Sequence, residues 1–386
     1  MDFVFALGSN GSGQLGIGHK EDISVPKPAL FSSAAGELSA HPPSPIVKVA
    51  AGGNHTLLLA ENGEIYSTGD PASGACGLKS AAAAGDAAEA GQSRPPVFHK
   101  IHLPAEQISQ VPDRLVAATW EASVITGPDE QGRGNRRVYS FGCGSKGELG
   151  QGPLIIRLPF AQPIANFPPP GTEVVGLSAC MGHVVAVLSN GDAYGWGNGR
   201  KGQLGAPAGV VTEPRKIEGV PFKVVKAACG KEFTCLVGEP GSGDIAVIGL
   251  DKWSVQSSAP TSVPGWRDLQ ASWGNIYVLQ ADRSILSWGR NDHGQLAPSG
   301  LPRMSQIAVG SEHVVAIDEA RETVAAWGWG EHGNCGPGPQ VQGDNSQGKT
   351  GWTVIASAKH IPPGSSITAI GAGCATSWVM IGKHAS

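Results

Sequence analysis

Gly197-Asn-Gly-Arg-Lys-Gly-Gln-Leu-Gly205 is one copy of a nine-residue pattern that returns along the chain and decides its fold. Close copies begin at four other glycines: Gly8, Gly142, Gly289 and Gly328. A degenerate copy begins at Gly69. A further repeat, at 245–249, keeps the strand but lacks the nine-residue turn. Self-similarity at intervals of tens of residues is the signature of a repeat architecture.

Strands surround each turn. A short apolar segment ending in glycine precedes it, as in Ala193-Tyr-Gly-Trp-Gly197. Before that segment comes a strand pair, read most clearly in Val47-Lys-Val-Ala-Ala-Gly-Gly-Asn-His-Thr-Leu-Leu-Leu59. Period-2 alternation with β-branched residues is typical of strands, and the pairs Asn62-Gly63 and Asn190-Gly191 are typical of hairpin turns. The repeating unit is therefore a small antiparallel sheet.

The two parts of the unit are out of phase at the chain ends. The strand that ends in glycine occurs at Gly8, Gly69, Gly142, Gly197, Gly249, Gly289 and Gly328. The strand pair also occurs seven times, but its first copy follows Gly8 and its last lies beyond Gly328. Pairing of residues 4–7 with residues 377–381 completes one unit from both ends. Because radial packing covers both faces of each sheet, we predict an all-β fold, a single seven-bladed β-propeller over residues 1–386.

Composition agrees with short strands and excludes other classes. The 386 residues include 56 Gly and 29 Pro, only 16% are charged, and the formal net charge is −4. Long helices need more Ala, Glu, Lys and Leu, and a basic nucleic-acid surface needs a positive balance. A small cluster of Arg133, Arg136 and Arg137 is typical of a solvated face rather than an RNA site. We expect no direct contact with nucleic acid.

The compartment is predicted from the N-terminus and the cysteines. The first residues lack a basic and apolar leader, and no apolar run reaches the length of a membrane span. The chain has 7 Cys, an odd number without a C-x-x-C pair, which indicates neither a disulfide framework nor a zinc ribbon. These features favour a reducing compartment, cytoplasmic and nuclear, with no membrane contact.

Two nucleotide-binding patterns are weak here. Gly343-Asp-Asn-Ser-Gln-Gly-Lys-Thr350 matches a phosphate loop, but the flanking residues read as extended chain rather than as a strand and a helix. G-x-G-x-x-G recurs after several strands, whereas a dinucleotide fingerprint occurs once and precedes a helix. We therefore predict no cofactor. The Ala-rich insertion Lys79–Pro96 has little to bury, and we predict a mobile loop there.

For several residues a functional role is conceivable, but the sequence favours a structural role. His55, His183 and His313 share one repeat position, where other repeats carry Phe233, Ile276 and Thr376. Apolar residues at that position favour packing with one hydrogen bond over a metal site. Cys76 and Cys335 replace a leucine and should behave as small hydrophobes, with a redox role for Cys335 as the alternative. We predict that Trp196, Trp288 and Trp327 form the cores of their blades.

The paired units Gly-x-x-His-Thr-Leu and Tyr-Gly-Trp-Gly-x-Gly-x-x-Gly-Gln-Leu-Gly resemble the repeats of the regulator of chromosome condensation family across nearly the whole chain. Within that family, residues 7–22, 327–337 and 373–381 resemble one fungal branch. This resemblance implies a non-enzymatic adaptor that forms a heterodimer with a small CSL-type zinc-ribbon protein, the electron donor of diphthamide synthesis on elongation factor 2. It also implies indirect support for Elongator-dependent modification of tRNA wobble uridines.

An alternative from another class is guanine-nucleotide exchange on a Ran-like GTPase, the activity of the founding family member. Exchange needs a wedge that enters the nucleotide site, and chromatin targeting favours a basic N-terminal arm, which this chain lacks. Nothing in the sequence resembles a nucleophile–base pair, a G-x-S-x-G elbow or a metal triad. We therefore predict no catalytic residues and no metal site.

Candidate partner-binding residues lie in two turns. Trp329, Glu331 and His332 occupy variable positions of one nine-residue copy, where a tryptophan is typical of an interface anchor. The structural alternative is that Trp329 covers the adjacent loop. His19 and Asp22 lie in the long loop after the first turn, and we predict that they belong to the same face.

Overall fold

The computed structural model describes residues 2–77, 95–101, 113–129, 131–337 and 351–383. Most of the Ala-rich insertion, residues 79–94, and the phosphate-loop pattern at 343–350 lie outside the described residues. The predictions made for those two segments therefore stay predictions.

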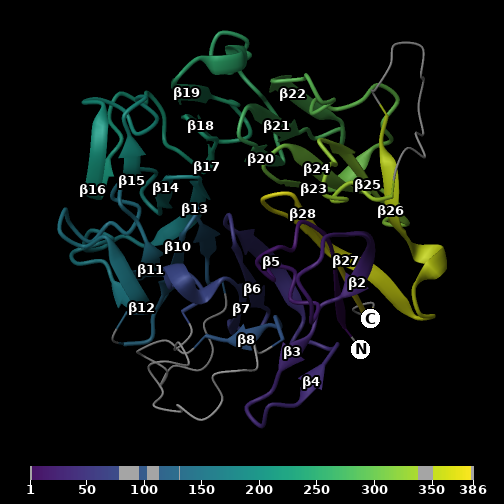
Figure 1. Cartoon of the computed structure of the whole chain (residues 1–386). Coiled ribbons are helices and arrows are strands. Elements are labelled where there is room, and N and C mark those ends of the chain that lie inside the picture. The colour runs from purple at the N-terminus through teal and green to yellow at the C-terminus, as the bar shows by residue number, and fades with distance from the viewer. Residues whose placement is uncertain (1, 78–94, 102–112, 130, 338–350, 384–386) are drawn as a thin grey trace.

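Seven antiparallel sheets, here called blades I to VII, surround a central axis (Figure 1). Blade I contains β27 (Ser365–Ala372), β28 (Thr376–Lys383), β1 (Phe3–Gly8) and β2 (Ile23–Pro28). Blade II contains β5 (Ile46–Ala51), β6 (His55–Ala60), β7 (Ile65–Gly69) and β8 (His99–Lys100). Blade III contains β9 (Val116–Ala118), β10 (Ala122–Gly127), β11 (Arg137–Cys143) and β12 (Arg157–Pro163). Blade IV contains β13 (Val174–Cys180), β14 (His183–Leu188), β15 (Ala193–Gly199) and β16 (Gly209–Lys216).

The remaining blades are V to VII. Blade V contains β17 (Lys226–Cys229), β18 (Phe233–Val237) and β19 (Ile245–Gly249). Blade VI contains β20 (Asp268–Ala271), β21 (Asn275–Leu279) and β22 (Ile285–Gly289). Blade VII contains β23 (Met304–Val309), β24 (His313–Asp318), β25 (Thr323–Gly328) and β26 (Thr353–Ser357). Outside the blades lie the hairpin β3 (Phe31–Ser32) and β4 (Leu38–Ser39), and the 3-10 helices η1 (Pro71–Ser73), η3 (Lys252–Ser254) and η4 (Ala358–His360).

The molecule has two distinct faces because each blade is antiparallel. The first strand of a blade is innermost, and it turns into the second strand at the same end where the third strand stops. This end, called the turn face, carries the nine-residue turns and the short turns such as 52–54. The opposite end, called the hairpin face, carries the hairpins such as Asn62-Gly63, where Gly63 has a φ of 82°.

The predicted strand-end glycines are confirmed. All seven have φ between 103° and 120°, a region that residues with a Cβ rarely adopt. A Cβ built on Gly197 lies 2.4 Å from the Gly182 carbonyl oxygen, and one on Gly69 lies 2.2 Å from that of Asn54. The glycine is therefore required by close approach of the third strand to the inner turn of its own blade.

Ring closure by the terminal strands is also confirmed. β1 pairs antiparallel with β28 over six residues, from Phe3 opposite Ile381 to Gly8 opposite Thr376. β2 then pairs with the free edge of β1, so both chain ends build blade I and lie close together in Figure 1. A ring closed in this way has no exposed inter-blade gap, which is how propellers protect their sheet faces.

Tryptophan indoles lock neighbouring blades together. Trp196 is fully buried, and its Nε1–H donates to the Glu148 carbonyl of blade III at 3.0 Å. Trp288 and Trp327 donate in the same way to the turns of the preceding blades, at 2.8 and 3.1 Å. The prediction that these three residues form blade cores is confirmed, and each also donates a hydrogen bond to a loop carbonyl of the preceding blade.

Replacing Trp196 with alanine should lower the free energy of unfolding by about 3–5 kcal/mol, because the change leaves a cavity between blades III and IV. Trp196→Phe keeps the ring volume in part and loses the hydrogen bond, so we expect a smaller loss. Urea denaturation followed by fluorescence measures both. Equal losses for the two variants would show that cavity formation does not dominate.

The three histidines have a structural role, as predicted. His55, His183 and His313 are buried, and the Nε2 atom of each lies 2.9 to 3.0 Å from a Ser or Thr hydroxyl of the next blade. Each hydroxyl donates in turn to a turn carbonyl, so it accepts from the histidine Nε2–H. These hydrogen bonds connect the second strand of one blade, its nine-residue turn and the next blade.

One assignment at this repeat position is wrong. Asn275, not Ile276, lies opposite the strand-end Gly289, as His55 lies opposite Gly69. In blade VI a serine, Ser272, stands where blades II, V and VII have Gly52, Gly230 and Gly310. The glycine that marks this position in the other blades is therefore missing here, and an error of one residue in a strand reverses the face.

Candidate protein-binding face

The predicted site residues all lie on the turn face but in two groups. Trp329, Glu331 and His332 belong to the β25–β26 turn of blade VII. His19 and Asp22 belong to the β1–β2 loop of blade I. The Trp329 backbone is fixed by the buried Asn334, whose Nδ2 donates to the Trp329 carbonyl at 2.8 Å. The turn therefore presents its variable side chains on a rigid base.

Trp329 is part of an aromatic and cationic cluster that spans three blades. Its ring stacks on His293 of blade VI, with centroids 4.5 Å apart and an interplanar angle of 11°. The Arg290 guanidinium carbon lies 6.0 Å from the Trp329 ring and 5.2 Å from the ring of Trp253 in blade V. We call Trp253, Arg290, His293 and Trp329 the tryptophan–arginine cluster. Its two tryptophans are 46% and 37% exposed, so the cluster is an outward-facing apolar surface.

Two carboxylates hold Arg290 in place. Arg290 Nη1 donates to Glu312 Oε1 at 2.8 Å, and Nη2 donates to Asp292 Oδ2 at 2.7 Å. The buried Gln295 donates to both carboxylates, at 3.0 and 3.1 Å. Hydrogen bonding to Arg290 lowers the pKa of Asp292 to about 2, so the network stays charged at neutral pH. Both carboxylates bind the edge of the guanidinium, which leaves its planar face for the two tryptophans.

Trp253 was not predicted from the sequence. It lies in η3, in the repeat that lost its nine-residue turn, and its φ of 61° is unusual for a bulky residue. The sequence shows that this copy lacks the turn glycines, but it does not show in which direction the Trp253 side chain points. Arg290 and His293 were visible only as variable turn residues.

A seam of polar residues joins the two groups and bridges blades VII and I. His332 Nδ1 and Asp22 Oδ2 lie 2.8 Å apart, and Asp22 Oδ1 accepts from the backbone N–H of Asn10 at 2.7 Å. His19 is joined to this loop because its backbone carbonyl accepts from Asn10 Nδ2 at 2.7 Å. Glu331 is exposed beside them. The structure therefore brings four predicted residues into one seam and places Trp329 in the neighbouring cluster.

The centre of the turn face is also aromatic. Trp120 of blade III and Trp273 of blade VI meet over the axis with ring centroids 6.1 Å apart. Backbone hydrogen bonds link the inner turns: Trp120 N–H donates to Met181, Trp273 N–H donates to Ser311, and Ser311 N–H donates to Gly373. The Lys231 ammonium lies 5.1 Å from the Trp273 ring. These contacts cover one end of the axial channel.

Other candidate groups have ordinary structural roles. Cys76 is buried and Cys335 is half-buried, and burial raises the pKa of each thiol to about 12. This agrees with the reading as small hydrophobes and disfavours the thiolate that redox chemistry needs. In the basic cluster, Arg133 pairs with Asp129 at 2.9 Å and Arg136 lies 3.8 Å from Glu173. Among the described residues, no three His, Cys, Asp or Glu side chains are placed to hold a metal ion. Within the same ranges, no helix has the length and hydropathy to cross a bilayer.

Comparison with known proteins places this fold in a family. The RCC1-like domain model matches residues 3–379. An RCC1 repeat-containing protein of Schizosaccharomyces pombe is 29% identical over 400 residues, which cover 99% of this chain and 99% of the relative. The secretion-regulating guanine nucleotide exchange factor of Mus musculus is 25% identical and covers 87% of this chain and 76% of its own length.

Solved structures agree on the architecture. Prp20p of Saccharomyces cerevisiae has a TM-score of 0.74 at 20% identity and covers 100% of this chain and 92% of its own. Human WBSCR16 has a TM-score of 0.75 at 18% identity and covers 98% and 99%. At these identities the likeness shows the fold alone. The family match over residues 3–379 settles the classification: the chain belongs to the RCC1-like domain family of seven-bladed β-propellers.

Proposed function

We propose that this propeller is a non-enzymatic adaptor that docks a small CSL-type zinc-ribbon protein on its turn face. Through that partner it supports diphthamide synthesis on elongation factor 2 and, indirectly, Elongator-dependent modification of tRNA wobble uridines. The identity of the partner rests on the resemblance of residues 7–22, 327–337 and 373–381 to fungal alpha-tubulin-suppressor proteins. A cytoplasmic and nuclear location belongs to the same proposal.

The observation that carries the adaptor role is the tryptophan–arginine cluster. Exposed tryptophan and arginine are the side chains most enriched among residues that dominate binding energy in protein interfaces. Here both tryptophans flank one guanidinium that is already fixed by Asp292 and Glu312, so little side-chain entropy is lost on binding. The seam of His332 and Asp22 lies beside the cluster and adds a polar margin.

Trp329→Ala and Trp253→Ala should each weaken binding of the zinc-loaded CSL protein by about 30-fold, the ratio for a hot-spot loss of ~2 kcal/mol. Titration calorimetry with the full chain measures this directly. Phe160→Ala is the matched control, because Phe160 is a 39% exposed aromatic residue on the outer strand of blade III. Its affinity should equal that of the unaltered chain.

Two results contradict the proposal in different ways. Absence of binding by the unaltered chain at tens of micromolar removes the CSL protein as partner. Binding that neither tryptophan variant weakens removes the turn-face cluster as the site and leaves the partner intact.

Nucleotide exchange on a Ran-like GTPase is the second candidate. It is favoured by the Mus musculus relative, a secretion-regulating guanine nucleotide exchange factor, and by the solved Prp20p, which is described as binding Gsp1p and histones. The discriminating measurement is release of a fluorescent guanine nucleotide from the GTPase with and without the chain. Acceleration that Trp329→Ala abolishes would favour exchange over the adaptor role.

A further inference from the structure

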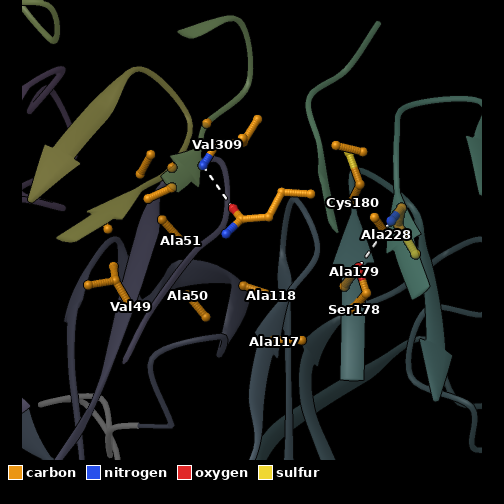
Figure 2. A pocket seen from close by; sticks show the side chains of 18 of the residues that line it. Val49, Ala50, Ala51, Ala117, Ala118, Ser178, Ala179, Cys180, Ala228 and Val309 are labelled. Atoms are coloured by element: carbon orange, nitrogen blue, oxygen red, sulfur yellow. Dashed lines mark hydrogen bonds between the residues drawn. The ribbon is translucent and has the colours of Figure 1, made fainter. Parts of the chain in front are cut away.

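The axial channel is a cavity of about 430 Å³ enclosed by the inner strands of all seven blades. Small side chains line much of it, and Figure 2 shows Ala50, Ala118 and Ala179 among the lining residues. A volume of this size accommodates a small organic molecule. Because Trp120 and Trp273 meet over the turn-face end, entry is from the hairpin face, where Val47 and Val175 are about half exposed.

Three charged residues occupy one level of this channel. Lys48 of blade II, Lys226 of blade V and Asp268 of blade VI each stand seven residues before the repeat position that pairs with the strand-end glycine. Blade II lies across the ring from blades V and VI, so Lys48 faces the other two over the channel. The strand register shifts between Ile46 and Lys48, a bulge of the kind that redirects a side chain.

Asp268 is already committed to other donors. It forms an ion pair with Lys226, accepts from the Leu269 backbone N–H at 2.9 Å, and accepts from Gln270 Nε2 at 2.9 Å. Gln270 is itself fixed, because its Oε1 accepts from the Val309 backbone N–H at 2.9 Å, the dashed line beside Val309 in Figure 2. Lys226 and Asp268 therefore neutralise each other within a closed network.

Lys48 is left without a counterion. No hydrogen bond or ion pair joins its ammonium group to any residue in the described ranges. Burial lowers the pKa of Lys48 to about 8; the Lys226 charge acts in the same direction, and Asp268 partly offsets both. Lys48 is half-buried in the channel. A partly desolvated cation without a partner is unfavourable, and an anion placed beside it reduces that cost.

We propose that the axial channel binds a small monoanion that carries one carboxylate or phosphate group on an apolar body, with Lys48 as the residue that pairs with the anionic group. The net charge of the level is one positive unit, which matches one anionic group. The alanine-rich walls match a short apolar body. Because the channel opens on the hairpin face, this site is separate from the proposed partner surface and does not depend on it.

Butyrate and dimethyl phosphate, both monoanions with apolar groups, are suitable probes, with the neutral butyramide as control for the apolar body. Both anions should raise the melting temperature of the full chain, since a ligand that binds only the folded state stabilises it. Lys48→Met should lower anion affinity by at least about tenfold, the effect of one lost charged hydrogen bond, and Lys48→Arg should restore most of it. A preference between the two anions identifies the head group.

Lys223→Met is the matched control, because Lys223 is an exposed lysine near the same face. Lys48→Met itself should fold with equal or greater stability without anion, since it removes an unpaired charge. Equal binding by Lys48→Met and the unaltered chain, or no stabilisation of the unaltered chain beyond that of chloride at the same ionic strength, overturns the proposal.

Butyrate affinity should also fall as the pH rises through about 8, because deprotonated Lys48 no longer attracts the anion. The other titratable groups that line the channel are Lys226, Cys180, Cys229 and Cys374, and Asp268 is the ion-pair partner of Lys226 at the same level. Burial raises the pKa of all three thiols, so they stay neutral in this range, and Lys226 and Asp268 are paired. An affinity that does not change across this range excludes Lys48 as the binding residue.

Discussion

Deletion of residues 2–8 is expected to abolish the single cooperative unfolding transition of the chain. These residues form β1, which lies between β28 and β2 and carries the fully buried Ala6 and Leu7. Burial of one Val or Leu side chain contributes about 1.5–3 kcal/mol, whereas a whole domain is stable by about 5–15 kcal/mol. Loss of this strand also opens the ring beside blade VII. Urea denaturation followed by circular dichroism and fluorescence is the measurement.

A single substitution tests the same closure with less change. Ala6→Pro removes a backbone donor from a strand that is paired on both sides, with Trp378 and with Lys27. Val25→Pro is the control, because it lies in the outer strand β2, where Pro26 and Pro28 already occur. Outer strands tolerate proline since one edge faces solvent. Ala6→Pro should destabilise the chain far more than Val25→Pro.

Contradictory results are easy to recognise. If the deletion leaves one transition, coincident by both probes and at an unchanged urea midpoint, the terminal strands do not hold the ring. If the two proline variants lose equal stability, pairing of β1 on both edges contributes no more to stability than pairing of the outer strand β2.

The fold could be predicted because the residues that determine the geometry of each repeat lie close together in the sequence. A glycine is needed at the end of each third strand, where that strand meets the inner turn of its own blade. Gly142 and Gly328, for example, can each be recognised from the sequence of their own repeat. Closure of the ring could be predicted from the order of the strands. β1 ends in glycine like the other third strands, but the two inner strands that precede each of those in the sequence do not precede β1. Because the same pattern occurs seven times, an error in one repeat, such as the assignment of Ile276, does not change the predicted fold.

The candidate site could be predicted only in part, because it depends on contacts between blades. Trp329 stood out as a tryptophan in a turn, but its neighbours His293 and Arg290 come from blade VI and Trp253 from blade V. No periodicity aligns these residues, since they lie at variable turn positions or in the degenerate repeat. Lys48 was hidden differently: it sits inside a regular strand, and only the closed ring places it opposite Lys226 and Asp268.

The second large effect expected is loss of stability in mild acid. Burial lowers the pKa of His55, His183 and His313 from 6.5 to about 4 each. The unfolded chain therefore binds more protons than the folded chain between these two values, so stability falls as the pH drops from 6.5 towards 4. Each histidine contributes about 3 kcal/mol to this loss, and three together about 9 kcal/mol, which is close to the whole stability of a domain.

The carboxylate Asp292 does not obscure this window. Its pKa is lowered to about 2, so stability linked to its ionisation is lost only below its ordinary value of 3.8. Glu64, whose pKa is lowered from 4.5, contributes only near and below that value, and Glu148, whose pKa is raised, acts in the opposite sense. Loss of stability between pH 6.5 and 4.5 is thus assigned to the buried imidazoles. Chemical denaturation at a series of pH values gives the free energy of unfolding at each, and its slope counts the protons taken up.

A triple variant His55→Asn, His183→Asn and His313→Asn tests the assignment, with asparagine chosen because Asn275 occupies this position in blade VI. At neutral pH the variant should be less stable, since the hydrogen bonds to Ser123, Thr234 and Ser377 are altered. Between pH 6.5 and 4 its stability should change little. His360→Asn, at an exposed histidine, should keep the acid sensitivity of the unaltered chain. A triple variant that loses stability in acid as steeply as the unaltered chain would show that other groups take up the protons.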